Sequence, residues 1–177
     1  MKKIIYIVII SILSCCSSVK NNNKHKKSNT HTVNIKSSCP ENGLCTFEVL
    51  ENQQLIISKD GIGQLYPKIT DGNTTVYKFT YTKNKDERYK DSHYSEEVYF
   101  ELPKQINELV LENESLSSVK LVFARLCFCR GQTGYYLINQ GKLIITKLKT
   151  DTYNINLSFK TDEVPQIISF IKETIHN

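Results

Sequence analysis

The chain has 177 residues, 40% of them hydrophobic, and a formal net charge of +5. A basic charge would suit a nucleic-acid-binding protein only if it lay on the folded domain. Residues 1–38 hold seven Lys and no acidic residue, whereas residues 39–177 carry 16 Lys and Arg against 18 Asp and Glu. The positive charge is therefore confined to the N-terminal segment, and we expect no nucleic-acid partner.

The first 18 residues, MKKIIYIVIISILSCCSS, have the parts of an export signal. Lys2 and Lys3 form a positive n-region, residues 4–13 form an apolar h-region, and the small residue Ser14 precedes Cys15. The apolar run is shorter than the roughly 20 residues that a membrane-spanning helix needs. The sequence therefore predicts export rather than a transmembrane anchor.

The ending ILSCCSS resembles the cleavage pattern of bacterial lipoproteins, in which Leu, a small residue, and Gly or Ala precede a Cys. The match implies a signal peptide over residues 1–14 and lipid on Cys15, with Cys16 as the alternative. The bias toward Lys, Asn and Ile is similar to that of small envelope lipoproteins of Bacteroidota. The resemblance implies a lipid anchor in the outer membrane, with the protein facing the periplasm. An ordinary secretory signal with incidental cysteines is the alternative interpretation.

Residues 15–38 are rich in Lys, Asn and Ser and hold almost no large apolar side chains. Such a segment cannot bury enough surface to offset the entropy of ordering its chain. We expect a lipid-anchored tether whose Lys side chains either lie near anionic headgroups or are simply solvated, two alternatives that the sequence leaves open. His25 and His31 match no metal-site spacing, and we expect both to be solvated.

Residues 39–177 have the length of a single domain. Their apolar residues mostly alternate in short runs that are separated by turn residues, which indicates β-strands. The clearest runs are residues 75–81, 98–102, 121–129, 135–139, 142–148 and 153–159, and weaker ones are 46–51, 54–58 and 106–111. Hairpin turns are expected at Asp60-Gly61, Asp71-Gly72-Asn73, Gly131 to Gly134 and Gln140-Gly141.

The C-terminal segment changes period and predicts an amphipathic helix. Asp162 would be its N-cap and Pro165 would lie in its first turn. The apolar residues with helical spacing are Val164, Ile167, Ile168, Ile171 and Ile175. The predicted fold is therefore mainly β, an antiparallel sandwich or open barrel of about eight to ten strands with one C-terminal helix.

Four cysteines of the domain, Cys39, Cys45, Cys127 and Cys129, are expected to form disulfides because export leads to an oxidising compartment. If residues 121–129 form one strand, the Cβ atoms of Cys127 and Cys129 are about 6.5 Å apart. A disulfide needs about 3.8 Å. We therefore favour two long-range bridges that join Cys39 and Cys45 to Cys127 and Cys129. The alternative is a local Cys39–Cys45 bridge, which leaves Cys127 and Cys129 as a thiol pair.

That thiol pair would lie beside Arg125 and Arg130, whose charges would favour the thiolate and so allow redox chemistry or soft-metal capture. The sequence has no GxSxG, HExxH, phosphate-loop or dinucleotide motif. The acidic segment of residues 86–97, with Asp91 and His93, is expected to be a solvated loop rather than a metal or glycan site. We expect no enzymatic activity, no metal and no cofactor.

The segment RGQTGYY, residues 130–136, is the most suggestive binding surface. Two glycines free the backbone of a hairpin tip, and Arg130, Gln132, Tyr135 and Tyr136 are of the kinds enriched at binding sites. An ordinary hairpin turn, with tyrosines alternating between core and surface, is the competing interpretation. The sequence thus favours a membrane-tethered β domain that binds an envelope protein, a glycan or a small ligand, with thiol-redox or metal handling as the alternative.

Overall fold

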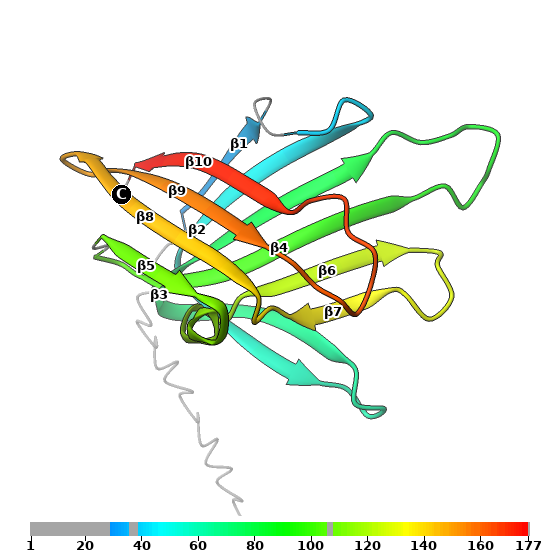
Figure 1. Ribbon diagram of the computed structural model, residues 1–177, viewed down its shortest axis with the longest axis horizontal. Coiled ribbons are helices and arrows are strands. Elements are labelled where there is room, and N and C mark those ends of the chain that lie inside the picture. The colour runs from blue at the N-terminus through cyan, green and yellow to red at the C-terminus, as the bar shows by residue number, and fades with distance from the viewer. Residues whose placement is uncertain (1–28, 36–38, 106–107, 177) are drawn as a thin grey trace, which may run out of the picture.

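The structure is a computed structural model that describes residues 29–35, 39–105 and 108–176. These residues form two antiparallel sheets that lie one over the other (Figure 1). The larger sheet has the strand order β1, β2, β3, β4, β6, β7 and the smaller has the order β10, β9, β8, β5. The strands are β1 (Thr30–Ile35), β2 (Gly43–Lys59), β3 (Leu65–Lys83), β4 (Tyr94–Pro103), β5 (Leu109–Glu112), β6 (Val122–Cys127), β7 (Gly134–Leu137), β8 (Gly141–Lys149), β9 (Thr152–Phe159) and β10 (Phe170–His176).

The predicted mainly β, antiparallel fold is confirmed, and within the described residues both sheets are open rather than closed into a barrel. The predicted C-terminal helix is wrong. Residues 170–176 form β10, which pairs with β9 from Phe170 opposite Ser158 to His176 opposite Thr152. The Ile residues of this segment satisfy a period of two as well as a helical period, and their β-branched side chains favour the strand.

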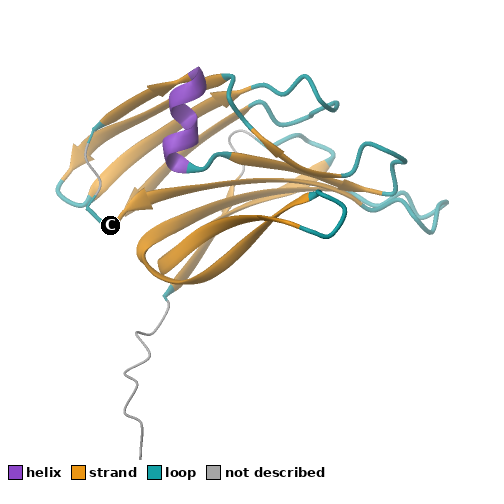
Figure 2. Cartoon of the chain, turned by 90° about the horizontal axis from the view of Figure 1, so that it is seen from below, coloured by secondary structure: helices purple, strands orange, loops and turns teal. Residues whose placement is uncertain are grey.

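One 3-10 helix, η1 (Asn113–Val119), connects β5 to β6 (Figure 2). It packs Leu116 and Val119 into the core. No helix in the described part of the chain is long and apolar enough to cross a membrane.

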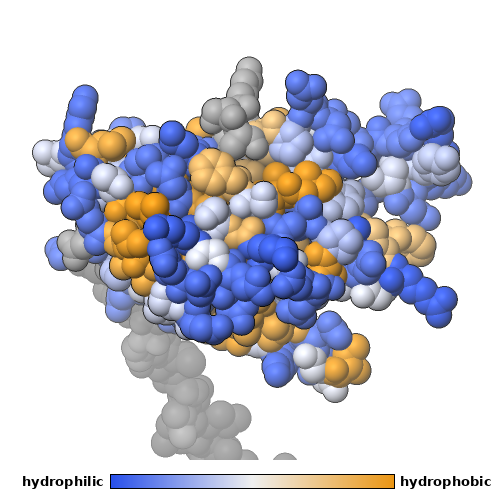
Figure 3. Space-filling model, viewed as in Figure 1, coloured by the Kyte–Doolittle hydropathy of each residue, from blue (hydrophilic) through white to orange (hydrophobic). Residues whose placement is uncertain are grey.

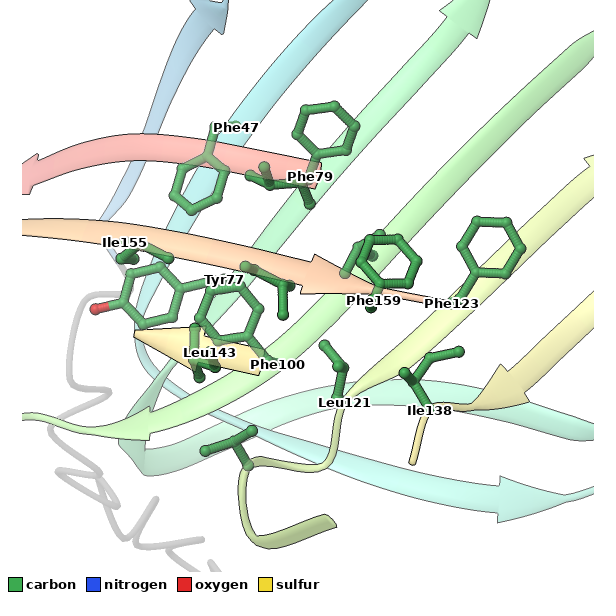
Figure 4. Packing of buried hydrophobic residues seen from close by; sticks show 14 of the residues in the cluster. Phe47, Tyr77, Phe79, Phe100, Leu121, Phe123, Ile138, Leu143, Ile155 and Phe159 are labelled. Atoms are coloured by element: carbon green, nitrogen blue, oxygen red, sulfur yellow. The ribbon is translucent and has the colours of Figure 1, made fainter. Parts of the chain in front are cut away.

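The main hydrophobic core fills the space between the two sheets (Figure 4). Alternate residues of each strand point into it, as the period of two requires. Tyr77 of β3 stacks on Phe100 of β4 with ring centroids 5.0 Å apart, and Phe123 of β6 contacts Phe159 of β9 across the sandwich. The Phe123–Phe159 contact joins the larger sheet to the smaller one, whereas Tyr77 and Phe100 lie on neighbouring strands of the larger sheet.

The β2–β3 hairpin is longer than the sheet and folds back across its outer face (Figure 2). The strands bend at a β-bulge between Glu51 and Gln53, beyond which the hairpin forms an arm, residues 53–71. Under this arm lies a second, smaller core in which Leu55 from the arm packs with Tyr99 and Val122. The larger sheet is therefore covered on both faces over part of its area.

The turn expected at Asp71-Gly72-Asn73 is wrong, because these residues lie within β3. The turn expected at Asp60-Gly61 is confirmed: the hairpin turns at residues 60–64, where the Asp60 carboxylate accepts hydrogen bonds from the backbone N–H groups of Ile62 and Gln64. A Cβ on Gly72 would lie 2.6 Å from the Cβ of Gln54. Gly72 thus permits close approach of two paired strands. The sequence Asp71-Gly72-Asn73 is equally compatible with a turn, so it does not distinguish between the two roles.

Part of the expected tether, Thr30–Ile35, is strand β1 and pairs with β2 at the edge of the larger sheet. Its β-branched residues suit a strand, and the backbone of β2 supplies hydrogen-bond partners that local composition does not reveal. The signal peptide, Cys15, Cys16 and His25 lie outside the described residues.

Candidate functional site

One end of the larger sheet gathers two connecting loops. Tyr94, the first residue of β4, pairs with Cys127, the last residue of β6. The β3–β4 loop (residues 84–93) and the β6–β7 loop (residues 128–133) therefore leave the sheet at the same end, on the right of Figure 1. We call these two loops the loop end. Loops held by a rigid sandwich are free to carry binding residues because they do not build the sheet.

A covalent ring of three residues lies where β6 passes into the β6–β7 loop, and we call this ring the apex of the loop end. A disulfide joins Cys127 to Cys129, whose Cα atoms are 5.2 Å apart. Phe128, between them, has 87% of its surface exposed. The turn then closes with a hydrogen bond from the backbone N–H of Gln132 to the carbonyl of Cys129 (3.0 Å) and with Gly131 at φ +71°. The ring therefore holds an aromatic side chain in solvent.

A shallow hollow of about 360 Å³ lies against this ring. It is lined by the ring residues themselves together with Arg130 and Thr133. Figure 3 shows that hydrophobic side chains also reach the surface at hairpin tips on this side of the molecule, among mostly hydrophilic neighbours. The apex thus combines an exposed aromatic ring, an exposed guanidinium and a concave surface.

Beneath the apex, Glu96 of β4 is fully buried. Its two carboxylate oxygens accept hydrogen bonds from the backbone N–H groups of Ile167 and Ile168, each at 2.7 Å. Those residues belong to the β9–β10 connection, residues 160–169. Because a buried carboxylate is tolerated only when donors satisfy it, Glu96 fixes that connection to the larger sheet.

Arg125 of β6 lies beside Glu96 in the register and has 9% of its surface exposed. Its Nη1 donates to the carbonyl and to the side-chain oxygen of Gln132, at 3.2 and 2.8 Å. Its Nε donates to the hydroxyl of Tyr94 (3.3 Å), which in turn donates to Glu96. Arg125 thus holds the β6–β7 loop against the sandwich.

Tyr94 links the two buried charges. Burial, together with the hydrogen bond to Glu96, raises the pKa of Tyr94 to about 12, while Arg125 acts in the opposite direction. The hydroxyl therefore keeps its proton at neutral pH and donates a hydrogen bond to the Glu96 carboxylate. We call the buried residues Glu96 and Arg125, together with their partners, the half-buried Tyr94 and the exposed Gln132, the buried base of the loop end.

The four predicted binding residues do not converge on one surface. Arg130 is exposed near the apex, whereas Gln132 is occupied by Arg125. Tyr135 packs against the smaller core under the arm, and Tyr136 packs against the main core. The tyrosines point to opposite faces because they are neighbours on one strand, β7.

The favoured cysteine pairing is wrong. The structure joins Cys39 to Cys45, with Cα atoms 5.6 Å apart, and Cys127 to Cys129. The predicted separation of Cys127 and Cys129 assumed that the strand continues to residue 129, but β6 ends at Cys127. The turn that follows brings the two sulfur atoms together. The alternative that leaves these cysteines as free thiols is equally at odds with the structure, although the local Cys39–Cys45 bridge it contained is present.

The acidic segment of residues 86–97 divides between a loop and a strand. Asp86 pairs with Arg88 in the β3–β4 loop, and that contact lowers the pKa of the Asp86 carboxyl. Glu96 and Glu97 belong to β4 and face opposite sides of the sheet. No group of three or more His, Cys, Asp or Glu within the described ranges is placed to hold a metal ion.

Sequence reasoning missed the buried base. Its signal is nevertheless present, because Glu96 lies in phase with the core residues Val98 and Phe100, and Arg125 lies in phase with Phe123. Comparison with known proteins adds no further assignment: no family model, no curated protein and no solved structure matches the chain.

Proposed function

We propose that this chain is a lipid-anchored, non-enzymatic protein of the bacterial envelope whose β-sandwich binds a partner protein through the loop end. The observation that carries the binding function is Phe128, which is 87% exposed inside a disulfide-closed ring. Exposing a large aromatic side chain in this way costs free energy in water unless a partner covers it.

The surroundings of Phe128 support a protein partner. Aromatic and Arg side chains are enriched among the residues that dominate protein–protein binding, and Arg130 lies next to the ring. A covalent ring also reduces the conformational entropy that binding would otherwise cost, since few backbone conformations remain to be lost. The buried base beneath it keeps the loop in place before the partner arrives.

The anchor rests on the sequence of the first 18 residues. Cleavage after Ser14 would expose Cys15 for acylation, with Cys16 as the alternative site, and the outer membrane facing the periplasm is the proposed location. The remaining residues before β1 would connect the lipid to the sandwich.

The anchor is tested by expressing the full chain in a diderm bacterium fed with labelled palmitate. We expect labelled protein in the outer-membrane fraction, no label after Cys15→Ala, and retained label after Cys16→Ala. The reverse pattern would move the lipid to Cys16. Unlabelled, soluble protein from the unmutated chain would contradict the anchor.

The binding function is tested separately by photo-crosslinking in the same cells. A photoreactive p-benzoylphenylalanine replaces Phe128 in one variant and Val110 in a matched control, because Val110 is also exposed (60%) but lies on β5. A discrete adduct formed from position 128 and not from position 110 is expected. Equal labelling from both positions, or none from position 128, would contradict docking through the apex.

A second candidate is thiol–disulfide exchange. The observation that favours it is the position of the Cys127–Cys129 bridge at the exposed end, since exposed disulfides are the ones that exchange with thiols. An attacking thiolate would break the Cys127–Cys129 bond, form a mixed disulfide with one sulfur and release the other as a thiolate. The test is transfer of electrons from a dithiol peptide to the chain, with the Cys127→Ser, Cys129→Ser double variant as control. An equal rate for the variant would eliminate this function.

A further inference from the structure

A groove opens at the edge of the sandwich, where it is lined by residues of β1 and β2 from the larger sheet and of β10 from the smaller sheet. The groove exists because the smaller sheet is narrower than the larger one. β10 covers Phe47 of β2, but the neighbouring inward-facing residue of β1, Val33, keeps 55% of its surface exposed. The groove has a volume of about 200 Å³.

The floor of this groove is apolar. Phe47 and Ile175 are almost fully buried, with exposed fractions of 2% and 4%. Val49, which also lines the groove, is half-buried. Drug-sized ligands occupy pockets of roughly 300–1,000 Å³. A groove of 200 Å³ is therefore matched to a smaller molecule with one compact apolar group.

Two carboxylates face this apolar floor. Glu173 lies in phase with the buried Ile171 and Ile175 of β10, so its side chain points toward the larger sheet. Among the described residues it has no hydrogen-bond or ion-pair partner, and burial raises the pKa of its carboxyl. Glu51 of β2 lines the same groove and accepts a hydrogen bond from Asn29 (3.3 Å).

Among the residues that the structure describes, no Lys or Arg lines the groove to balance these charges. The other titratable groups that line it are His31 of β1 and His176 of β10, both exposed, and His176 contacts the Thr152 hydroxyl through its Nδ1. A half-buried carboxylate without a partner is stabilised by any cation that reaches it.

We propose that this groove binds a small organic ammonium ion, with its apolar body on Phe47 and Ile175 and its ammonium group against Glu173. Both parts of the ligand are needed. The apolar body gains from burial on the floor, and the ammonium supplies a positive charge that no described residue lining the groove supplies. This site is separate from the loop end and does not depend on it.

The test is a titration of the full chain in detergent with cyclohexylammonium, followed through the backbone amide NMR signals of Val49 and Ile175. We expect saturable shifts that cyclohexanol and cyclohexanecarboxylate do not reproduce. Glu173→Gln should weaken binding at least tenfold. Glu87→Gln, which removes the same charge from an exposed residue of the β3–β4 loop, should leave the affinity unchanged.

Three results would overturn the proposal. Equal binding of cyclohexanol would show that the carboxylate plays no part. Unchanged affinity in Glu173→Gln, with its amide spectrum still that of the folded chain, would place the cation elsewhere. Shifts at Val49 and Ile175 that depend on protein concentration and not on the amine would show that a second copy of the chain covers the groove.

Discussion

The buried base and the apex of the loop end are held in place by different means. In the base, Glu96 is fully buried and its carboxylate oxygens accept two backbone hydrogen bonds at 2.7 Å, while Arg125 holds the neighbouring loop. At the apex, Phe128 is 87% exposed inside a disulfide-closed ring that belongs to neither hydrophobic core. Residues that stabilise this end are therefore separate from the residues that it offers to a partner.

The two disulfides show the same contrast. Cys45 is fully buried in the main core, and Cys39 packs against it, so the first bridge is part of the packed interior. Cys127 and Cys129 belong to neither core. Substitutions in the buried base should therefore lower the stability of the protein. Substitutions at the apex should lower its binding to a partner.

The largest effect is expected from Glu96→Ala. The substitution leaves the backbone N–H groups of Ile167 and Ile168 without acceptors and removes the partner of the Tyr94 hydroxyl. Since each unsatisfied buried donor costs about 1–3 kcal/mol, the free energy of unfolding should fall by about 3 kcal/mol or more. Urea denaturation measures this fall.

Glu87→Ala is the matched control for Glu96→Ala. Glu87 is exposed in the β3–β4 loop, and its substitution removes the same charge. It should change the free energy of unfolding by less than about 0.5 kcal/mol. If the two variants were equally stable, Glu96 would not be fixing the β9–β10 connection, and the distinction between base and apex would fail.

The next largest effect is expected when the Cys39–Cys45 disulfide, which we call the core bridge, is removed by Cys39→Ala with Cys45→Ala. Closing a ring over a sequence separation of six residues stabilises a protein by about 2 kcal/mol in the chain-entropy model. Loss of the buried Cys45 side chain from the core adds to this cost. In thermal unfolding under oxidising conditions, the double variant should show a lower midpoint temperature than the unmutated chain. Reduction of the disulfides in the unmutated chain should reproduce most of this decrease.

Removal of the apex bridge by Cys127→Ala with Cys129→Ala should cost less. Its sequence separation is only two residues, so the same model gives about 1.5 kcal/mol, and no core packing is lost. Hydrogen exchange should rise in residues 128–133 and stay unchanged in β4. A loss of stability larger than that from the core bridge would mean that the apex, too, is structural.

The strands could be predicted from the sequence because alternation of apolar residues is a local signal. The buried base could not be recognised in the same way, because a charged residue at an inward position reads as a break in the pattern. Glu96 and Arg125 occupy inward positions in strands that only the register makes neighbours. Two opposite charges at core positions of separate strands are the sign that could have revealed the base.

The errors at the C-terminus and at the cysteines have a common physical origin. Ile171 and Ile175 fit both a helical period and a period of two, and pairing of residues 170–176 with β9 decided between them. Cys127 and Cys129 were judged by strand geometry, whereas the end of β6 at Cys127 allowed the turn that joins them. In both cases a tertiary contact or a strand boundary overrode a local rule.

The smallest effect on stability, and the largest on binding, is expected from Phe128→Ser. The side chain is 87% exposed, so the free energy of unfolding should change by less than about 0.5 kcal/mol. Photo-crosslinking from a p-benzoylphenylalanine at position 130 should nevertheless be lost, because the aromatic anchor beside it is gone. Ile62→Ser is the matched control, since Ile62 is equally exposed (84%) at the tip of the arm and should leave the adduct intact. An adduct that survives Phe128→Ser would show that Phe128 contributes nothing to docking, and the partner would then have to be recognised by Arg130 or by the β3–β4 loop.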